Sequence, residues 1–384
     1  MDLLTHSTID ILASLVEFNT VSSNSNLELV SFVQAFLETY GVRCNIQKNE
    51  TGTKASILAS IGPKVTGGII LSAHTDVVPV EGQNWSNDPF SLLIKGQKAY
   101  GRGTCDMKGF MASTLAAVPK FMNAKLPVPI HLAYSYDEEV GCAGVGPLID
   151  CIISLNLEPA LCIVGEPTNM ETVSAHTGKQ IFKCIFLGTP IHSSFAPSAT
   201  NAISLAGDII HKLNQFSLDL KSCTTGNDRF PISHPTINIG QIEGGTAPNI
   251  VAKDCSFLVE YRYPPKTPQY LLRDKLDALF ANLREDQTGR YEEIISYPAF
   301  LSEANTHALR LINNTLGTCE PLAVNYGTEA GLYAAAGIDT IVLGPGDIRQ
   351  AHQPDEYIEL SQLEACDLFL DGLIHKLSVE GLSQ

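Results

Sequence analysis

Apolar residues near the start of the chain recur with the spacing of two amphipathic helices. Thr8 can cap the first helix, whose apolar face consists of Ile9, Leu12, Leu15 and Val16. The second helix repeats this spacing at Leu29, Phe32, Phe36 and Tyr40 and ends before Gly41. Each helix is therefore expected to pack one face against a core.

Four short apolar runs, each bounded by turn residues, are typical of strands buried on both faces. They cover residues 69–73, 130–136, 161–164 and 340–343. Helical patterns lie between them, for example at 107–121 and 330–336. Strands that alternate with helices predict the α/β class, with a mostly parallel sheet flanked by helices.

The pattern changes at about Gly178. Strand, helix, strand, strand and helix are predicted at 182–186, 201–216, 236–242, 254–262 and 269–283, and a closing strand at 291–297. This order indicates a compact α+β unit, after which the helix–strand alternation resumes. With 384 residues the chain is long enough for two domains. We therefore predict a catalytic domain of residues 1–178 and 299–384, into which a second domain, 179–298, is inserted.

Composition narrows the class of protein. Hydrophobic residues make up 44% and charged residues 17%, which is typical of a globular chain. The formal net charge of −16 disfavours nucleic acid as a partner, and the chain has no apolar run of the ~18 residues that a membrane span requires. The ten cysteines form no C-x-x-C pair, and residues 1–6 lack the pattern of a signal peptide, so we expect a cytoplasmic protein with reduced thiols.

Metal-capable side chains follow the predicted strands where they end. His74 and Asp76 follow the first strand, residues 137–139 (Asp-Glu-Glu) the second, Glu166 the third and His352 the fourth. In open α/β sheets, ligands bind beyond the carboxyl ends of the strands. These groups are therefore expected to meet in one crevice.

Asp106 stands in a glycine-rich segment, 101–109, that can turn tightly and bring it to the same place; the plainer interpretation is a helix cap. Two histidines and several carboxylates without cysteine suit zinc, cobalt or manganese. The ligands are too many for one open tetrahedral site, whereas two ions accommodate them. Glu138 and Glu139 point in opposite directions on an extended segment, so one can bind metal while the other takes a proton from water.

Plainer interpretations exist for each motif alone. An isolated Asp-Glu-Glu is usually a solvated charge cluster, and an isolated His-Thr-Asp a polar loop. Ser193 and Ser194 beside His192 suggest a serine hydrolase, but no G-x-S-x-G motif is present. The joint placement at four strand ends favours metal-dependent hydrolysis.

On these residues the chain resembles the aminoacylase and acetylornithine deacetylase family of dinuclear zinc amidohydrolases, which includes carboxypeptidases, dipeptidases and succinyl-diaminopimelate desuccinylase. The matching motifs are SAHTDVVPV at 72–80, GRGTCDMKG at 101–109, DEEVG at 137–141, GEPT at 165–168 and AHQPDEY at 351–357. The match extends over nearly the whole chain.

The resemblance implies roles for individual residues. His74 and Glu166 would hold one zinc ion, Glu139 and His352 the other, and Asp106 would bridge the two. Glu138 would be the general base and acid, and Asp76 would orient the imidazole of His74.

The resemblance also implies that the inserted domain is a lid through which the chain forms a homodimer. His192 would reach the partner's active site and stabilise the oxyanion, although a lone histidine is more often a surface or core residue. Asn249 and Arg262 would bind a substrate carboxylate; for Arg262 an ordinary ion pair at a strand end is the alternative.

The segments NYGTEA at 325–330 and GPG at 344–346 are most similar to the acetylornithine deacetylase subgroup. Glu329 would pair with the side-chain amine of ornithine or cap the helix that follows it. The implied reaction is the removal of acetate from N2-acetyl-L-ornithine in arginine synthesis. The alternatives are a related N-acyl-amino-acid hydrolase, a dipeptidase or a desuccinylase, and more remotely a binding protein that holds metal without catalysis.

Overall fold

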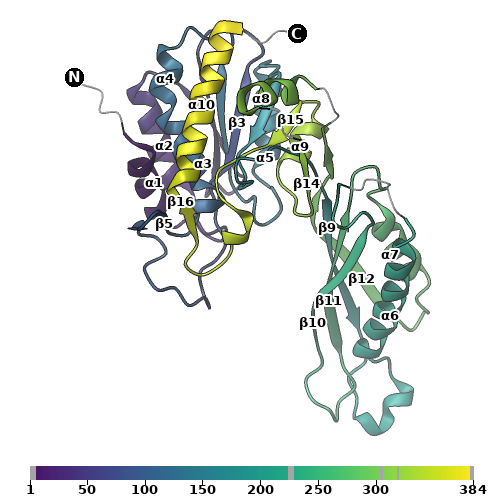
Figure 1. Ribbon diagram of the computed structural model, residues 1–384. Helices are drawn as coiled ribbons and strands as arrows, with labels where there is room; N and C mark the ends of the chain where they lie inside the picture. Colours follow the sequence, from purple (N-terminus) through teal and green to yellow (C-terminus); the bar gives the residue numbers. More distant parts are fainter. Residues whose placement is uncertain (1–5, 224–228, 303–305, 318–319, 381–384) are drawn as a thin grey trace. The chain divides into compact units, whose positions relative to one another are not determined.

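The computed structural model divides the chain into two compact units (Figure 1). It describes residues 6–223, 229–302, 306–317 and 320–380. Unit 1 consists of residues 1–174, 302–322 and 328–384, and unit 2 of residues 175–301 and 323–327. Three segments that were predicted to lie in the catalytic domain, 175–178, 299–301 and 323–327, therefore belong to unit 2.

A mixed sheet forms the centre of unit 1. Its strand order is β1 (Cys44–Lys48), β2 (Ala55–Ile61), β6 (Ile130–Ser135), β3 (Ile69–His74), β7 (Leu161–Val164) and β15 (Thr340–Val342), followed by β8 (Val173–His176). The strands β6, β3, β7 and β15 run parallel, and all four are buried along their whole length. The α/β class with a mostly parallel sheet is confirmed.

Helices of unit 1 pack against this sheet or, like α1 and α10, against the helix α3 (Figure 1). They are α1 (Thr8–Glu17), α2 (Leu27–Thr39), α3 (Gly109–Ala116), α4 (Val118–Asn123), α5 (Val145–Ser154), α8 (His307–Leu316), α9 (Ala330–Ala335) and α10 (Leu360–Glu380). Ser7, and not Thr8, caps α1, because its hydroxyl accepts from the backbone N–H of Asp10 in a capping box. The helix predicted at 107–121 is two helices, with Pro119 in the first turn of the second.

Smaller strands complete the large sheet and form a second one. β13 (Phe300–Leu301) and β14 (Leu322–Val324) pair with β8. The three-stranded sheet has the order β16 (Tyr357–Glu359), β5 (Lys98–Tyr100) and β4 (Leu93–Lys95). Its pairing of Tyr357 with Tyr100 joins the segment after His352 to the segment before Asp106.

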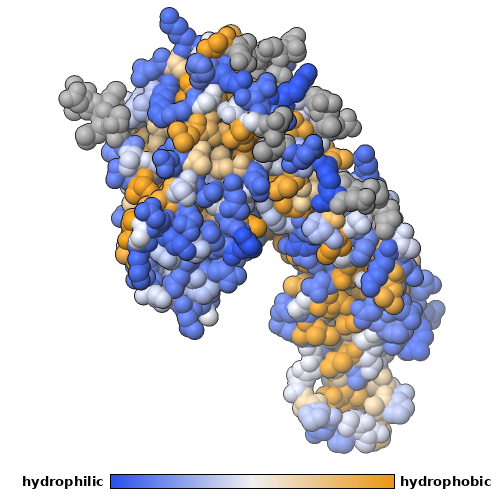
Figure 2. Space-filling view, viewed as in Figure 1, coloured by the Kyte–Doolittle hydropathy of each residue, from blue (hydrophilic) through white to orange (hydrophobic). Residues whose placement is uncertain are grey.

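Unit 2 is an antiparallel sheet with two helices. The strand order is β10 (Thr236–Gly244), β11 (Asp254–Tyr263), β9 (Gly178–Leu187) and β12 (Thr288–Tyr297), and the helices are α6 (Ala202–Leu220) and α7 (Leu271–Ala281). Alternate residues of β9 and β11 are buried, which is the pattern of a sheet covered on one face. Unit 2 also exposes apolar side chains, including Ile242 on the edge strand β10, and apolar residues are visible over it in Figure 2.

The cysteines of the described residues form no disulfide. Part of the expectation of reduced thiols rested on Cys319, and part of the expectation that a signal peptide is lacking rested on residues 1–5. These residues lie outside the described residues. Within the described residues, no helix has the length and apolar character needed to cross a bilayer.

Candidate metal centre

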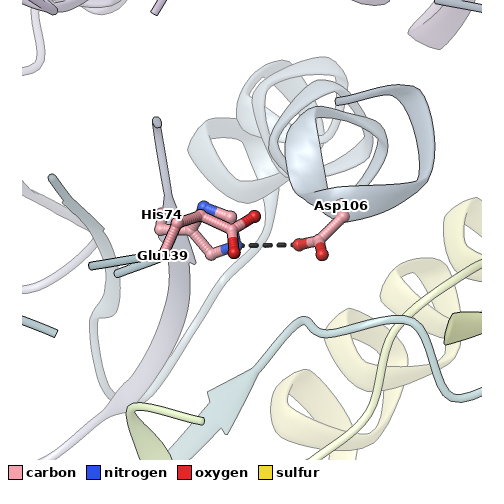
Figure 3. Close-up of side chains that lie close together, drawn as sticks. All are labelled: His74, Asp106 and Glu139. Carbon is pink, nitrogen blue, oxygen red and sulfur yellow. Dashed lines mark hydrogen bonds and ion pairs between the residues drawn. The ribbon is translucent and has the colours of Figure 1, made fainter. Parts of the chain in front are cut away.

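Five side chains from strand ends and loops of unit 1 converge at the carboxyl edge of the parallel sheet. His74 is the last residue of β3, Glu139 follows β6 and Glu166 follows β7. Asp106 comes from the turn Thr104–Lys108, and His352 from the loop after β15. Figure 3 shows three of them, His74, Asp106 and Glu139. The sequence analysis predicted this convergence from the ends of the apolar runs and, for Asp106, from the glycine-rich segment 101–109.

Asp106 lies between the two histidines. Its Oδ1 is 2.8 Å from Nε2 of His74, and its Oδ2 is 3.2 Å from Nε2 of His352. Nε2 of His74 also lies 3.8 Å from Oε1 of Glu166, and Nε2 of His352 lies 3.2 Å from Oε1 of Glu139. The five groups thus form two pairs, His74 with Glu166 and His352 with Glu139, and the Asp106 carboxylate reaches both.

The Asp106 side chain does not cap a helix. The residue at the cap of α3 is Lys108, and no side-chain capping bond is made there. The two carboxylate oxygens of Asp106 face the histidines instead. The plainer interpretation of Asp106 is therefore wrong.

The imidazole of His74 is oriented by a backbone group. Its Nδ1 donates to the backbone carbonyl oxygen of Asp76 at 2.9 Å, which leaves Nε2 directed at Asp106. The Asp76 carboxylate lies farther away, 3.6 Å from Nδ1. Asp76 thus orients His74 through its main chain.

The carboxylate of Asp76 holds the segment that carries the two glutamates. Oδ1 accepts from the backbone N–H of Glu138 at 3.0 Å, and Oδ2 accepts from that of Glu139 at 3.3 Å. Oδ2 also accepts from the hydroxyl of Ser22 at 2.7 Å. Sequence reasoning missed Ser22, because a serine after α1 carries no signal of its own.

Glu138 lies beside His74 and Glu166. A carboxylate oxygen of Glu138, one of Glu166 and a ring nitrogen of His74 all lie within 4.8 Å of one another. The thiol of Cys142 lies 3.5 Å from Oε1 of Glu138, a contact that sequence reasoning also missed. Burial, with the negative charges of Glu139, Glu329 and Asp106, raises the pKa of Glu138 well above its ordinary value.

The electrostatics of the other groups reflect one cluster of buried acids. Burial and the negative charge of Asp106 raise the pKa of both Glu139 and Glu166. Burial alone would lower the pKa of His74, but the hydrogen bond it donates to Asp106 and the surrounding carboxylates raise it well above its ordinary value. Hydrogen bonds to Asp106 and Glu139 raise the pKa of His352 to about 11. The site therefore has a strong excess of negative charge, which a bound cation offsets.

Close backbone packing positions Glu166. A Cβ on Gly165 would lie 2.0 Å from the Phe110 ring, and a Cβ on Gly344 would lie 2.1 Å from the carbonyl oxygen of Gly165. The strand ends that carry Glu166 and precede His352 can approach only because neither residue has a side chain.

Glu329 is only 1% exposed, and its charge acts on Glu138. It accepts from the hydroxyl of Ser135, at the end of β6, and from that of Ser72 in β3 at 3.4 Å. Glu329 occupies the N-cap position of α9, as one of the two predictions had it, but its side chain makes no capping hydrogen bond there. Burial raises the pKa of Glu329 to about 7.

The three other predicted residues belong to unit 2. His192 is exposed, and its Nδ1 lies 2.8 Å from the hydroxyl of Ser194. The backbone of Asn249 is close to it, because its carbonyl oxygen accepts from the N–H of Ser193 at 2.9 Å. Arg262 is ion-paired with Glu260, with Nε 2.8 Å from Oε1.

The donor set fits divalent metal ions. Ligand atoms of His74, Asp106 and Glu139 lie within 4.8 Å of one another. The same holds for His74, Glu138 and Glu166. Imidazole nitrogen and carboxylate oxygen are ligands of zinc and of neighbouring divalent ions. His74, Asp106, Glu139, Glu166 and His352 together offer more ligands than one open site uses.

Sequence comparisons identify relatives of this chain. Residues 70–376 match the peptidase family M20/M25/M40. The chain is 34% identical over 360 residues to an acetylornithine deacetylase of Proteus mirabilis (strain HI4320), which covers 92% of this chain and 90% of that protein.

Solved structures share the fold. An M20 family metallo-carboxypeptidase from Sulfolobus solfataricus superposes with a TM-score of 0.81 at 18% identity, over 97% of this chain and 100% of that one. A dinuclear metal-binding peptidase of the M20 family from Bacillus subtilis gives a TM-score of 0.63 at 15% identity, over 96% of both chains.

Proposed function

This chain belongs to the peptidase family M20/M25/M40 and is a metal-dependent hydrolase of amide bonds, and we propose that it removes the acetyl group from N2-acetyl-L-ornithine. The products are L-ornithine and acetate, as in arginine synthesis. The observation that carries this substrate is the 34% identity to an acetylornithine deacetylase over 92% of the chain. We assign the reaction to the cytoplasm, in keeping with the free cysteines of the described residues.

Two divalent ions, zinc or else cobalt or manganese, would occupy the centre. His74 and Glu166 would hold one, His352 and Glu139 the other, and Asp106 would bind both, in keeping with its place between the histidines. When bound, such ions supply Lewis acidity, which makes water a better nucleophile near neutral pH and polarises the amide carbonyl.

Glu138 would move the proton. It takes a proton from the attacking water and returns it to the leaving amine, so that one carboxylate serves as base and then as acid. Burial raises the pKa of Glu138, which makes its carboxylate a stronger base toward water. The carboxylate of Asp76 holds the backbone of Glu138 in place.

Unit 2 would act as a lid and as the dimer contact. β10 is an edge strand of its sheet and exposes Ile242, so a second copy can extend the sheet there. His192 would stabilise the oxyanion in the partner's site. Asn249 and Arg262 would bind the substrate carboxylate, and Arg262 would then exchange its ion pair with Glu260 for one with substrate.

The role of Glu329 as a partner of the ornithine amine has less support. Its carboxylate is buried and hydrogen-bonded to Ser135 and Ser72. A substrate amine would have to displace these bonds.

A substrate panel tests the proposal. kcat/KM is measured for N2-acetyl-L-ornithine, other N-acetyl amino acids, dipeptides and N-succinyl-diaminopimelate with the metal-loaded enzyme. Acetylornithine should give the highest value. A preference for dipeptides or for the succinyl compound would assign the same centre to the alternative activities, and the absence of any metal-dependent hydrolysis would favour a binding protein.

Mixed dimers test the action of His192 in the partner subunit. His192→Ala and Glu138→Gln are each expected to be nearly inactive. When the two variants are co-expressed, the mixed dimer contains one site with both an intact Glu138 and an intact His192 from the other subunit. Recovery of activity supports action between subunits, and no recovery requires His192 to act within its own chain.

A further inference from the structure

The carboxylate of Glu356 is enclosed by hydrogen-bond donors. Oε1 accepts from the backbone N–H groups of Cys105 at 2.9 Å and Asp106 at 3.1 Å. Oε2 accepts from the N–H of Gly103 at 3.0 Å and from Nη1 of Arg102 at 2.7 Å. The residue is 1% exposed, so these four donors replace water around the charge.

These donors form the turn that presents Asp106. Gly103 has φ +83°, and a Cβ there would lie 2.8 Å from Val77, so glycine is needed for the turn to close around Glu356. The amides of Gly103, Cys105 and Asp106, all directed at one anion, form a concave cradle of N–H groups. Without the anion they would be buried donors lacking an acceptor.

The same residue anchors the segment that carries His352. The backbone carbonyl of Glu356 accepts from the N–H of Gly101 at 2.9 Å, and the next residue, Tyr357, pairs with Tyr100. Gln83 donates to the carbonyl of His352 at 3.1 Å and accepts from Arg102. Arg102 itself lies over the Trp85 ring, 4.9 Å from its centroid.

We propose that Glu356 is a positioning residue, which holds the Asp106 turn and the His352 segment in the arrangement that binds the two metal ions. This inference rests on the proposed metal centre. In this proposal Glu356 contacts neither substrate nor metal. It determines the positions of two of the five ligands, Asp106 and His352. The arrangement would therefore exist before metal binds, because the acceptor that closes the turn belongs to the chain.

The substitution Glu356→Gln tests the role of the charge with little change in size. Gln has one acceptor oxygen, and its NH2 group would face the N–H of Gly103 and the guanidinium of Arg102, both donors. Displacement of groups that orient metal ligands typically weakens metal binding 10- to 100-fold, and we expect a loss of about that size. Affinity for zinc is measured by competition with a chelator.

Glu359→Gln is the matched control. Glu359 lies three residues further along, in β16, and pairs with the partly exposed Lys98 at 3.4 Å, away from the turn. The control should bind zinc with wild-type affinity. At saturating zinc, Glu356→Gln should keep the wild-type KM within about twofold, because the substrate-binding groups are unchanged. Wild-type zinc affinity in Glu356→Gln would overturn the proposal.

A double variant separates the cradle from the ion pair. Glu356→Gln leaves Arg102 buried without its partner, which by itself disturbs a fold. Arg102→Met with Glu356→Gln removes that charge, so this protein should be folded, with a metal-free melting temperature close to that of the control. Its zinc affinity should remain low, because the N–H of Gly103 still faces the NH2 group of Gln in place of an acceptor. Restored affinity would show that the unpaired arginine was the cause and would overturn the proposal.

The two proposals fail in different ways. If the wild-type protein bound no metal ions or hydrolysed no amide, the proposed function would fall. If the wild-type protein bound two ions and Glu356→Gln bound them equally well, only the role of Glu356 would fall.

Discussion

Oδ1 of Asp76 accepts a hydrogen bond from the backbone N–H of Glu138 at 3.0 Å. Oδ2 accepts from the next amide, that of Glu139, so one carboxylate holds the main chain of both adjacent glutamates. The proposed base and a proposed metal ligand therefore depend on a residue that follows a different strand. Since Asp76 also accepts from His74 through its carbonyl oxygen, it joins three functional groups.

Asp76→Asn should lower kcat by roughly 10- to 100-fold, the range for loss of a group that orients catalytic ligands. One side-chain oxygen is replaced by an NH2 group that would face an amide donor. Steady-state kinetics at saturating metal measure the effect. Asp208→Asn, on the exposed surface of α6, is the control and should leave kcat unchanged. An unchanged kcat in Asp76→Asn would show that the Glu138 segment is held by other groups.

Glu138→Gln should reduce kcat by about 10²- to 10⁴-fold, the usual contribution of general acid–base catalysis. The variant retains the five proposed ligands, so its metal content should match that of the wild type. Elemental analysis and kinetics on the same sample separate the two effects. Turnover at the wild-type rate would exclude Glu138 as the base.

Gly165→Ala should destabilise the protein by roughly 1–3 kcal/mol, the usual cost of overpacking, because its Cβ would lie 2.0 Å from the Phe110 ring. The displaced strand end carries Glu166, so zinc affinity should fall as well. Gly146→Ala is the matched control: its Cβ meets no atom within 4 Å, and the residue lies in α5. That substitution should stabilise the fold by about 0.5–1 kcal/mol. Chemical unfolding and chelator competition measure both.

Glu329→Gln should change how stability depends on pH. Burial raises the pKa of Glu329 to about 7 in the folded protein, above the ordinary value of 4.5. Between these values the folded state binds the proton more tightly than the unfolded state, so stability is greatest below the window and falls as pH rises through it. The slope from one group is at most about 1.4 kcal/mol per pH unit. Urea unfolding of the metal-free protein from pH 4.5 to 8 should show a smaller decline for the variant.

Removal of metal should abolish activity and lower the melting temperature. Without cations the buried carboxylates of Asp106, Glu139 and Glu166 repel one another, and binding to the folded state alone stabilises that state. Dialysis against a chelator followed by calorimetry measures the loss. Addition of zinc, cobalt or manganese should restore both properties to differing extents. Activity that survives complete metal removal would contradict the assignment.

The sequence predicted the site because continuous apolar runs mark strands buried on both faces, and such strands in a parallel sheet end at a common edge. His74 and Glu166 could be placed for this reason. The donors that bind the Asp76 carboxylate could not be predicted, because a carboxylate two residues after a histidine has the same sequence pattern whether it contacts the ring or a distant backbone amide. The burial of Glu329 depends on Ser72 and Ser135, which lie in β3 and β6, far from it in sequence.

The hydrophobic pattern also could not predict where individual helices begin and end. Ser7 and Thr8 are both good capping residues, and only the reciprocal bond of Asp10 with Ser7 decides between them. The division of the predicted helix between α3 and α4 follows from Pro119, whose missing N–H interrupts the run.

The insertion of unit 2 between Glu166 and His352 sets an order of events during synthesis. A chain made from its amino end can assemble β3, β6 and β7, and so bring His74, Asp106, Glu139 and Glu166 together, before His352 exists. Glu356, the acceptor that closes the Asp106 turn, is made later still. The ligand set proposed for the second ion can therefore be complete only after the whole insert has been synthesised.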